Sequence, residues 1–253
     1  METKLKIGSY TFAAEPFHCD FKHRLFLGHL CNALLNAADY HSSERGYGMS
    51  YLNTMHKTWV LSRLAIKVKR LPKAKEQFVV NTWIDDVMRM FTSRNFTVDV
   101  NEDEIVSCKT VWAMIDTTTR RPVNIAEVNN GLIVNYIDKE KPCSASIPDR
   151  ISLGTDASMQ RQLQMEYSDA DVNGHVNSVK LIDHVLDLFD ISWHRQQAID
   201  EFDIFYKTES HPGDVLSFYK EQTADNEWNV RVERPTDKGF VEVCRCRIVA
   251  RRE

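Results

Sequence analysis

The residues best suited to chemistry form one short polar cluster ahead of an apolar segment. Asp171, Asn173 and His175 supply a carboxylate, an amide and an imidazole within five positions. Together such groups can orient a carbonyl, move a proton and activate water. The apolar residues that follow recur every three or four positions, which predicts a helix over 176–189. The cluster is therefore expected at a helix N-terminus, where unpaired N–H groups could stabilise an oxyanion.

A purely structural interpretation of these residues stays open. Asp171 or Asn173 could cap the helix, and His175 could be a histidine with structural contacts only. For any one of the three residues alone this interpretation is favoured. The combination of all three at the start of a buried helix favours a functional site.

Separated stretches of the chain resemble the plant and bacterial acyl-acyl carrier protein (acyl-ACP) thioesterases. In the first half, residues 59–63 (WVLSR) resemble the family's W-V-x-x-R, residues 112–116 (WAMID) resemble W-V-M-x-N, and residues 119–122 (TRRP) resemble T-R-R-P/L. In the second half, residues 171–180 resemble D-x-N-x-H-V-N-x-V-K, and residues 206–209 resemble Y-x-x-E. The matches span most of the chain. The resemblance implies an α+β tandem (double) hotdog, in which antiparallel sheets each wrap a long central helix. It also implies hydrolysis of a fatty acyl thioester carried on phosphopantetheine.

The resemblance adds Glu209 to the catalytic set, because the matching glutamate of the family faces the other three groups across a cleft. From the local sequence alone, Glu209 would be a solvated carboxylate at a strand end. We expect Glu209 or Asp171 to be the base that activates water, His175 to be the second proton-transfer group, and Asn173 to hold the carbonyl. The chain has no G-x-S-x-G elbow for a serine nucleophile. Ser210 replaces the family's cysteine, which excludes a cysteine nucleophile and favours water.

The same order of elements is predicted twice along the chain. The first copy comprises a strand over 4–15, a helix over 25–38 ended by a glycine-containing loop over 41–48, and strands over 64–68, 78–83, 94–100 and 106–114. The second comprises a strand over 162–167, the helix over 176–189, and strands over 202–206, 215–219, 228–232 and 240–249. A segment rich in polar residues and proline, 138–160, separates the copies.

This order predicts an internal duplication. A Gly-His pair recurs at 28–29 and 174–175, which indicates an offset of 146 and places Leu25 and Leu27 where the second copy has Asp171 and Asn173. We therefore expect residues 1–140 to be a non-catalytic hotdog that lines the acyl pocket. Residues 141–160 would be a linker, and 161–253 the catalytic hotdog.

Bulk properties exclude several classes of protein. The 253 residues are 43% apolar and 27% charged with a net charge of −4, which is typical of a globular protein and not of a general nucleic-acid binder. No apolar run is long enough for a membrane span or a secretory signal, so a cytoplasmic location is expected.

No metal or cofactor is predicted. The six cysteines include no C-x-x-C pair, and Cys244 and Cys246 are expected on the buried face of a strand. His175 and His184 are nine residues apart, which places them on opposite sides of a helix, so we expect that they cannot share a metal ion.

The expected partner is an acyl carrier protein bearing a phosphopantetheine-linked acyl chain, in fatty acid biosynthesis and lipid metabolism. Because such a carrier is acidic, docking would use positive surface, and basic residues gather over 67–75, at 120–121 and over 245–252. Each group is more often a solvated face than a docking site. Two other functions stay open: a hotdog acting on acyl-CoA or dehydrating a 3-hydroxyacyl thioester, and a non-catalytic acyl-binding module. Pairing of two chains as a homodimer also stays open.

Overall fold

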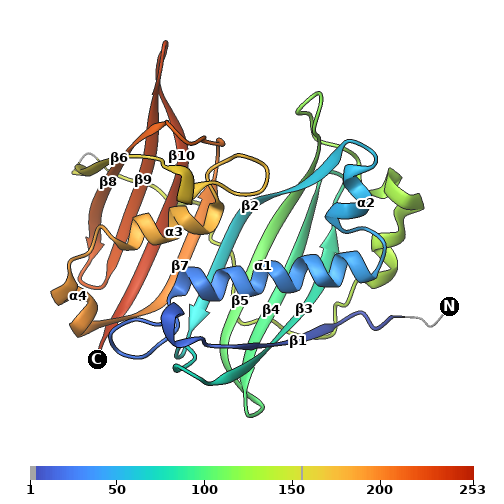
Figure 1. The fold of residues 1–253 in the computed structure, drawn as a ribbon, viewed down its shortest axis with the longest axis horizontal. Coiled ribbons are helices and arrows are strands. Elements are labelled where there is room, and N and C mark those ends of the chain that lie inside the picture. Colours follow the sequence, from blue (N-terminus) through green and yellow to red (C-terminus); the bar gives the residue numbers. More distant parts are fainter. Residues whose placement is uncertain (1–3, 155) are drawn as a thin grey trace. The chain divides into compact units, whose positions relative to one another are not determined.

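The apolar alternation of the first half produces an antiparallel sheet around a long helix. The computed structural model describes residues 4–154 and 156–253, and the chain divides into two units after Ser146. In the first unit the strands lie in the spatial order β1-β3-β4-β5-β2, and α1 lies across one face of this sheet (Figure 1). Their bounds are β1 Gly8–Ala13, α1 Leu27–Glu44, β2 Lys57–Val68, β3 Gln77–Val87, β4 Phe91–Val100 and β5 Asp103–Asp116.

The core of the first unit forms between the apolar stripe of α1 and the sheet. Leu30 and Leu34 of α1 are fully buried, as are Trp83 of β3 and Phe96 of β4. Burying each such side chain contributes roughly 1.5–3 kcal/mol. Each predicted strand of this half is present, and all of the sheet strands extend beyond the predicted limits except β1, which is shorter.

Helix α1 is longer than predicted. The prediction ended the helix at residue 38 and placed 41–48 in a loop, but the helix continues to Glu44 and the chain turns at Gly46, whose φ is +78°. Within this last turn His41 is buried and hydrogen-bonded to Lys6 and Tyr47, both outside the helix, which stabilises a segment that looks like a loop in sequence. A short unpredicted helix, α2 (Met49–Asn53), follows. Two further unpredicted 3₁₀ turns lie within Ile125–Tyr136, separated by a kink at Val128–Gly131.

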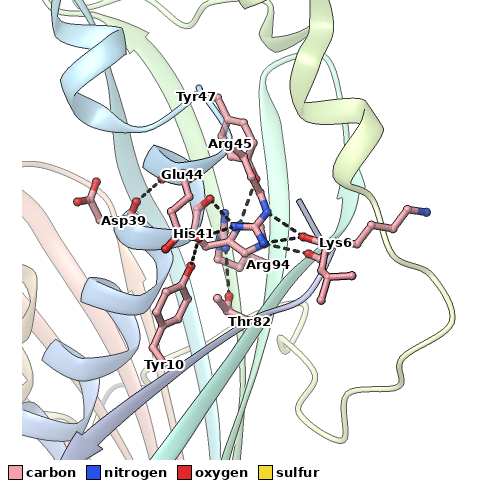
Figure 2. A network of polar contacts seen from close by, with 11 residues as sticks. Lys6, Tyr10, Asp39, His41, Glu44, Arg45, Tyr47, Thr82 and Arg94 are labelled. Atoms are coloured by element: carbon pink, nitrogen blue, oxygen red, sulfur yellow. Dashed lines mark hydrogen bonds and ion pairs between the residues drawn. The ribbon is translucent and has the colours of Figure 1, made fainter. Parts of the chain in front are cut away.

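A buried polar network surrounds His41 in the first unit (Figure 2). His41 is fully buried, its Nε2–H donates to the carbonyl of Lys6 at 2.9 Å, and its Nδ1 lies 3.2 Å from the Tyr47 hydroxyl. Burial, and next the positive charge of Arg94, lower the pKa of His41 to about 2. His41 is therefore a neutral imidazole that accepts a hydrogen bond from Tyr47.

The same network fixes the N-terminal segment of the described chain. Arg45 donates from Nε and Nη2 to the carbonyl of Leu5, at 3.0 and 2.6 Å. Tyr10 donates its hydroxyl to Glu44 at 3.1 Å, and burial together with this carboxylate raises the pKa of Tyr10 to about 12. The end of α1 thus anchors the residues that lead into β1.

The second unit repeats the arrangement with a shorter helix. Its strands lie in the order β7-β10-β9-β8-β6. Their bounds, with those of the helices, are β6 Ser158–Gln164, α3 Ser178–Leu186, α4 Ile191–Gln196, β7 Gln197–Tyr206, β8 Val215–Ala224, β9 Glu227–Thr236 and β10 Gly239–Arg252. Cys244 and Cys246 are fully buried, as predicted for one face of β10.

Two elements of the second unit end before their predicted limits, whereas β7 to β10 cover or exceed theirs. The helix predicted over 176–189 is α3, which begins at Ser178 and ends at Leu186, and α4 was not predicted. The strand predicted over 162–167 ends at Gln164, and a 3₁₀ turn over Tyr167–Asp169 follows. A capping box between Glu166 and Asp169 closes this turn, which ends the extended conformation.

The polar segment between the units is held by contacts on each side. Before the division, Lys141 lies over the ring of Trp83 at 4.9 Å, and the Ser144 hydroxyl lies 2.6 Å from that of Ser107. After it, Arg245 donates to the carbonyl of Ile151 at 3.0 Å. Along the ranges 4–154 and 156–253, no helix has the length and apolar character needed to cross a bilayer.

Candidate active site

Asp171 closes a tight turn with its own side chain. Its Oδ1 accepts the backbone N–H of Asn173 at 2.8 Å and that of His175 at 3.1 Å. Its backbone N–H donates to the carbonyl of His175 at 2.8 Å. Gly174, at a φ of +77°, supplies the left-handed residue that lets the chain reverse. Asp171 therefore holds both backbone polar groups of His175.

This turn precedes the helix and is not its cap. Asn177 is the N-cap of α3, and its side chain accepts the N–H of Val179 at 2.9 Å. A backbone bridge between Ala170 and Val176 closes the turn before the helix begins. The alternative in which Asp171 or Asn173 caps the helix is wrong, because a later residue, Asn177, is the N-cap of α3.

The structure brings His175 and Glu209 together. His175 Nε2 lies 3.6 Å from Glu209 Oε2, and the two side chains are 25% and 34% exposed, so solvent reaches both. A backbone hydrogen bond holds the two segments together: the N–H of Val176, which follows His175, donates to the carbonyl of Ser210, which follows Glu209, at 2.7 Å. Glu209 lies in the loop after β7.

The remaining predicted residue, Asn173, is exposed, and its backbone N–H is held by Asp171. His211, which the sequence analysis did not select, lies against His175 with the ring centroids 4.9 Å apart and the rings at 69°. Its position two residues after Glu209 is the only signal in the sequence that could have indicated it.

Ser210 has no activated hydroxyl. The residue is 2% exposed, and its Oγ has no hydrogen-bond partner among the residues that the structure describes. Its carbonyl is engaged by Val176. Because a serine nucleophile needs a base within hydrogen-bond reach, this geometry favours water as the attacking group.

A second carboxylate–imidazole pair lies beneath the turn. Asp169, 6% exposed, places Oδ1 2.8 Å from His184 Nε2, and its carbonyl accepts the N–H of Asn177 at 2.8 Å. This pair was not predicted, because His184 was compared with His175 as if both lay on one helix, whereas His175 lies before α3. Within the described residues, no group of three or more histidine, cysteine or acidic side chains is arranged to hold a metal ion.

The first unit contains the same turn, with the aspartate kept and the other side chains changed. Asp20 Oδ1 accepts the backbone N–H of Lys22 at 2.8 Å and that of Arg24 at 2.9 Å, and Asp20 N–H donates to the Arg24 carbonyl at 2.7 Å. His23 has a φ of +58°, as Gly174 has a positive φ in the second turn. A 3₁₀ turn precedes each of them.

These contacts set the register of the duplication. The two turns lie 151 residues apart, from Asp20 to Asp171. The predicted offset of 146 is wrong because the Gly-His pair at 28–29 lies inside α1, whereas that at 174–175 lies before α3. Leu25 and Leu27 are therefore not the counterparts of Asp171 and Asn173.

The correct counterparts show where the copies differ. Leu25 N–H donates to the Pro72 carbonyl at 2.8 Å, as Val176 does to Ser210, which makes Leu71 the counterpart of Glu209. In the same register Asp20, Lys22 and Arg24 are the counterparts of Asp171, Asn173 and His175. The first unit keeps the aspartate and lacks the imidazole and the second carboxylate.

The other motifs that carried the resemblance have structural contacts in the first unit. Trp59 donates its indole N–H to the carbonyl of Tyr47 at 3.0 Å. Asp116 accepts the backbone N–H groups of Thr118 and Thr119 with Oδ1, which closes the loop after β5. These contacts shape the first unit.

Comparison with known proteins gives matches along most of the chain. Models of the acyl-ACP thioesterase N-terminal domain and C-terminal domain match residues 9–130 and 153–245. The palmitoyl-acyl carrier protein thioesterase of Arabidopsis thaliana is 28% identical over 163 residues, which are 62% of this chain and 40% of that protein. The dodecanoyl-[acyl-carrier-protein] hydrolase of Cinnamomum camphora is 28% identical over 197 residues, 75% of this chain and 52% of that protein. The chain thus spans about half or less of the length of these plant relatives.

Solved structures match over the whole chain. A crystal structure of an acyl-ACP thioesterase from Bacteroides thetaiotaomicron is 43% identical, with a TM-score of 0.90 over 97% of this chain and 98% of that one. The 12:0-ACP thioesterase from Umbellularia californica is 21% identical, with a TM-score of 0.87 over the full length of both chains. The tandem hotdog expected from the sequence is confirmed.

Proposed function

The chain belongs to the acyl-ACP thioesterase family, and we propose that it hydrolyses the thioester between a fatty acyl chain and acyl carrier protein. The products would be a free fatty acid and the free thiol of the carrier's phosphopantetheine. The observation that carries this proposal is the His175–Glu209 pair, 3.6 Å apart and open to solvent, in the unit matched by the C-terminal domain model.

In the proposed reaction, Glu209 removes a proton from a water molecule while the water oxygen bonds to the thioester carbonyl carbon. The carbonyl oxygen takes the negative charge, and the Asn173 amide is the proposed donor to it. When the intermediate collapses, the C–S bond breaks, and the proton held by Glu209 passes through His175 to the leaving sulfur. The water supplies both the new hydroxyl of the acid and the proton of the thiol, so the reaction balances without a cofactor.

We assign the chemistry to the second unit and acyl binding to the first. Residues 1–140 would be the non-catalytic hotdog that holds the acyl chain, 141–160 the linker, and 161–253 the catalytic hotdog. This assignment is supported by the first unit's counterparts of His175 and Glu209, which are Arg24 in the turn and Leu71 in the neighbouring segment. Neither side chain can relay a proton at neutral pH.

The carrier protein is part of the proposal. Its acidic surface would be attracted to the basic residues of this chain, and raising the ionic strength should slow acyl-ACP hydrolysis more than hydrolysis of an acyl-CoA of the same chain length. An equal salt effect on the two substrates would contradict docking through charge.

The test is release of free thiol from matched acyl-ACP and acyl-CoA substrates. We expect wild type to cleave acyl-ACP, and His175→Ala and Glu209→Gln to lower kcat by roughly 10²–10⁴-fold. Glu140→Gln, at the exposed residue just before the linker, is the matched control and should keep wild-type rates. Wild type that releases no thiol from any acyl-ACP would refute the proposed function and leave the acyl-binding and dehydratase alternatives.

A further inference from the structure

We propose that Asp171 is a positioning residue and not the base: its carboxylate holds the turn that presents His175 to Glu209. The inference rests on the proposed function for the identity of the reaction. It divides the four candidate residues, because Asp171 would act through the backbone while Glu209 and His175 move the protons.

The first support is how Asp171 is engaged. Its Oδ1 accepts two backbone N–H groups, those of Asn173 and His175, and its own N–H donates to the His175 carbonyl. The structure thus gives the carboxylate a complete local role in fixing where the His175 backbone lies. Glu209, by contrast, lies beside the imidazole itself.

The second and independent support is the copy of the turn in the first unit. Asp20 makes the same three contacts within 0.2 Å of those of Asp171. There, Arg24 and Leu71 replace the imidazole and the second carboxylate. Asp20 Oδ2 also accepts from the Arg24 guanidinium at 3.3 Å, so the three turn contacts of Oδ1 and the backbone N–H are what the two aspartates share. An aspartate that keeps these three contacts where no proton-transfer pair exists indicates that the turn itself uses the carboxylate.

The two turns also share the connection to the neighbouring loop. Val176 N–H donates to the Ser210 carbonyl, and Leu25 N–H donates to the Pro72 carbonyl. In the second unit this hydrogen bond joins Val176 to Ser210, the residues that directly follow His175 and Glu209. If the turn lost its shape, His175 would therefore shift away from Glu209. A displacement of about 1 Å at a reacting group can cost 10²-fold in rate.

The decisive pair of variants is Asp171→Asn and Asp171→Ala. An asparagine Oδ1 can accept the same two N–H bonds but cannot act as a base, whereas alanine removes the bonds. We expect Asp171→Asn to keep kcat on acyl-ACP within about tenfold of wild type and to keep the shape of its pH–rate profile. Asp171→Ala should lose roughly 10²-fold or more in kcat.

Amide hydrogen exchange, measured without substrate, follows the turn directly. The N–H groups of Asn173 and His175 should stay protected in Asp171→Asn and exchange faster in Asp171→Ala. Asp20→Ala is the matched control: it should loosen the first turn to a similar degree while kcat stays within a few-fold of wild type.

The outcomes separate the two proposals. If Asp171→Asn is as inactive as Asp171→Ala while both amides stay protected, the carboxylate takes part in the chemistry and the inference is wrong. If wild type hydrolyses no thioester, the proposed function falls on its own evidence. In that case the exchange experiment still decides, because unchanged protection in Asp171→Ala would refute the positioning role.

Discussion

Acidification should destabilise the first unit through one buried imidazole. In the folded chain His41 is fully buried beside Arg94, and its pKa is about 2. In the unfolded chain the same imidazole titrates near its ordinary pKa of about 6.5. Between these two values the unfolded state binds a proton that the folded state does not.

The sign and size of the effect follow from this difference. The contribution is constant above about pH 6.5 and is lost as the pH falls, at about 1.4 kcal/mol per pH unit. By pH 4.5 the loss should reach about 3 kcal/mol, a large part of the 5–15 kcal/mol typical of a domain. The loss would stop growing only near pH 2, where the folded imidazole also takes up a proton.

The perturbation that isolates this term is His41→Gln. Glutamine can donate to the Lys6 carbonyl and accept from the Tyr47 hydroxyl, but it does not titrate. Unfolding by urea from pH 7.5 to 4.5, with amide exchange in α1 as the probe of the first unit, gives the difference between the two proteins at each pH. We expect wild type to lose about 3 kcal/mol more than the variant.

Other ionisable groups also change the stability with pH, but they are common to both proteins and cancel in the difference. A difference that does not vary with pH would mean that folded His41 accepts a proton in this range. The description of His41 as a buried, neutral imidazole hydrogen-bonded to Lys6 and Tyr47 would then be wrong.

Three substitutions test contacts of the second unit by denaturant unfolding. Arg247→Met should lower the free energy of unfolding by about 3–5 kcal/mol, because it removes the guanidinium 2.9 Å from the buried Asp203, and acid should recover part of the loss. His184→Leu should lower the free energy of unfolding by a similar amount, because it leaves the buried Asp169 carboxylate without its imidazole partner. Adding Asp169→Asn should restore most of that stability, and a double variant no more stable than His184→Leu would contradict this reasoning. Gly174→Ala should cost only about 1 kcal/mol, the penalty of a positive φ, since no atom lies within 4 Å of the added Cβ; a loss of several kcal/mol would show that the space is filled.

Sequence periodicity predicted the regular elements where burial alone decides them. The alternation around Phe96 and around Cys246 placed β4 and β10 correctly, because one face of each strand packs in a core. It failed at the end of α1, since His41 looks like a loop residue until its partners, Lys6 and Tyr47, are known. Neither partner lies on the helix.

The site was predictable in residue type and not in its internal geometry. The local sequence drew attention to Asp171 and His175, whereas Glu209 came only from the family resemblance, because a carboxylate at a strand end is ordinary. The register of the duplication was hidden because the two turns share their hydrogen bonds and only one residue type, the aspartate at positions 20 and 171. A periodicity of side chains cannot reveal a repeat that is kept by backbone contacts.

The contacts of the segment before Ile147 decide where the chain can be divided for expression of the first unit alone. A cut at residue 140 would remove Lys141 from the face of Trp83 and Ser144 from its partner Ser107. The shortened protein would carry an uncovered indole and a strip of strand polar groups exposed to solvent, which favours aggregation. A fragment that ends at Ser146 keeps Lys141 and Ser144 and their contacts with Trp83 and Ser107. It should therefore be more soluble than the fragment that ends at residue 140, although the two differ by only six residues.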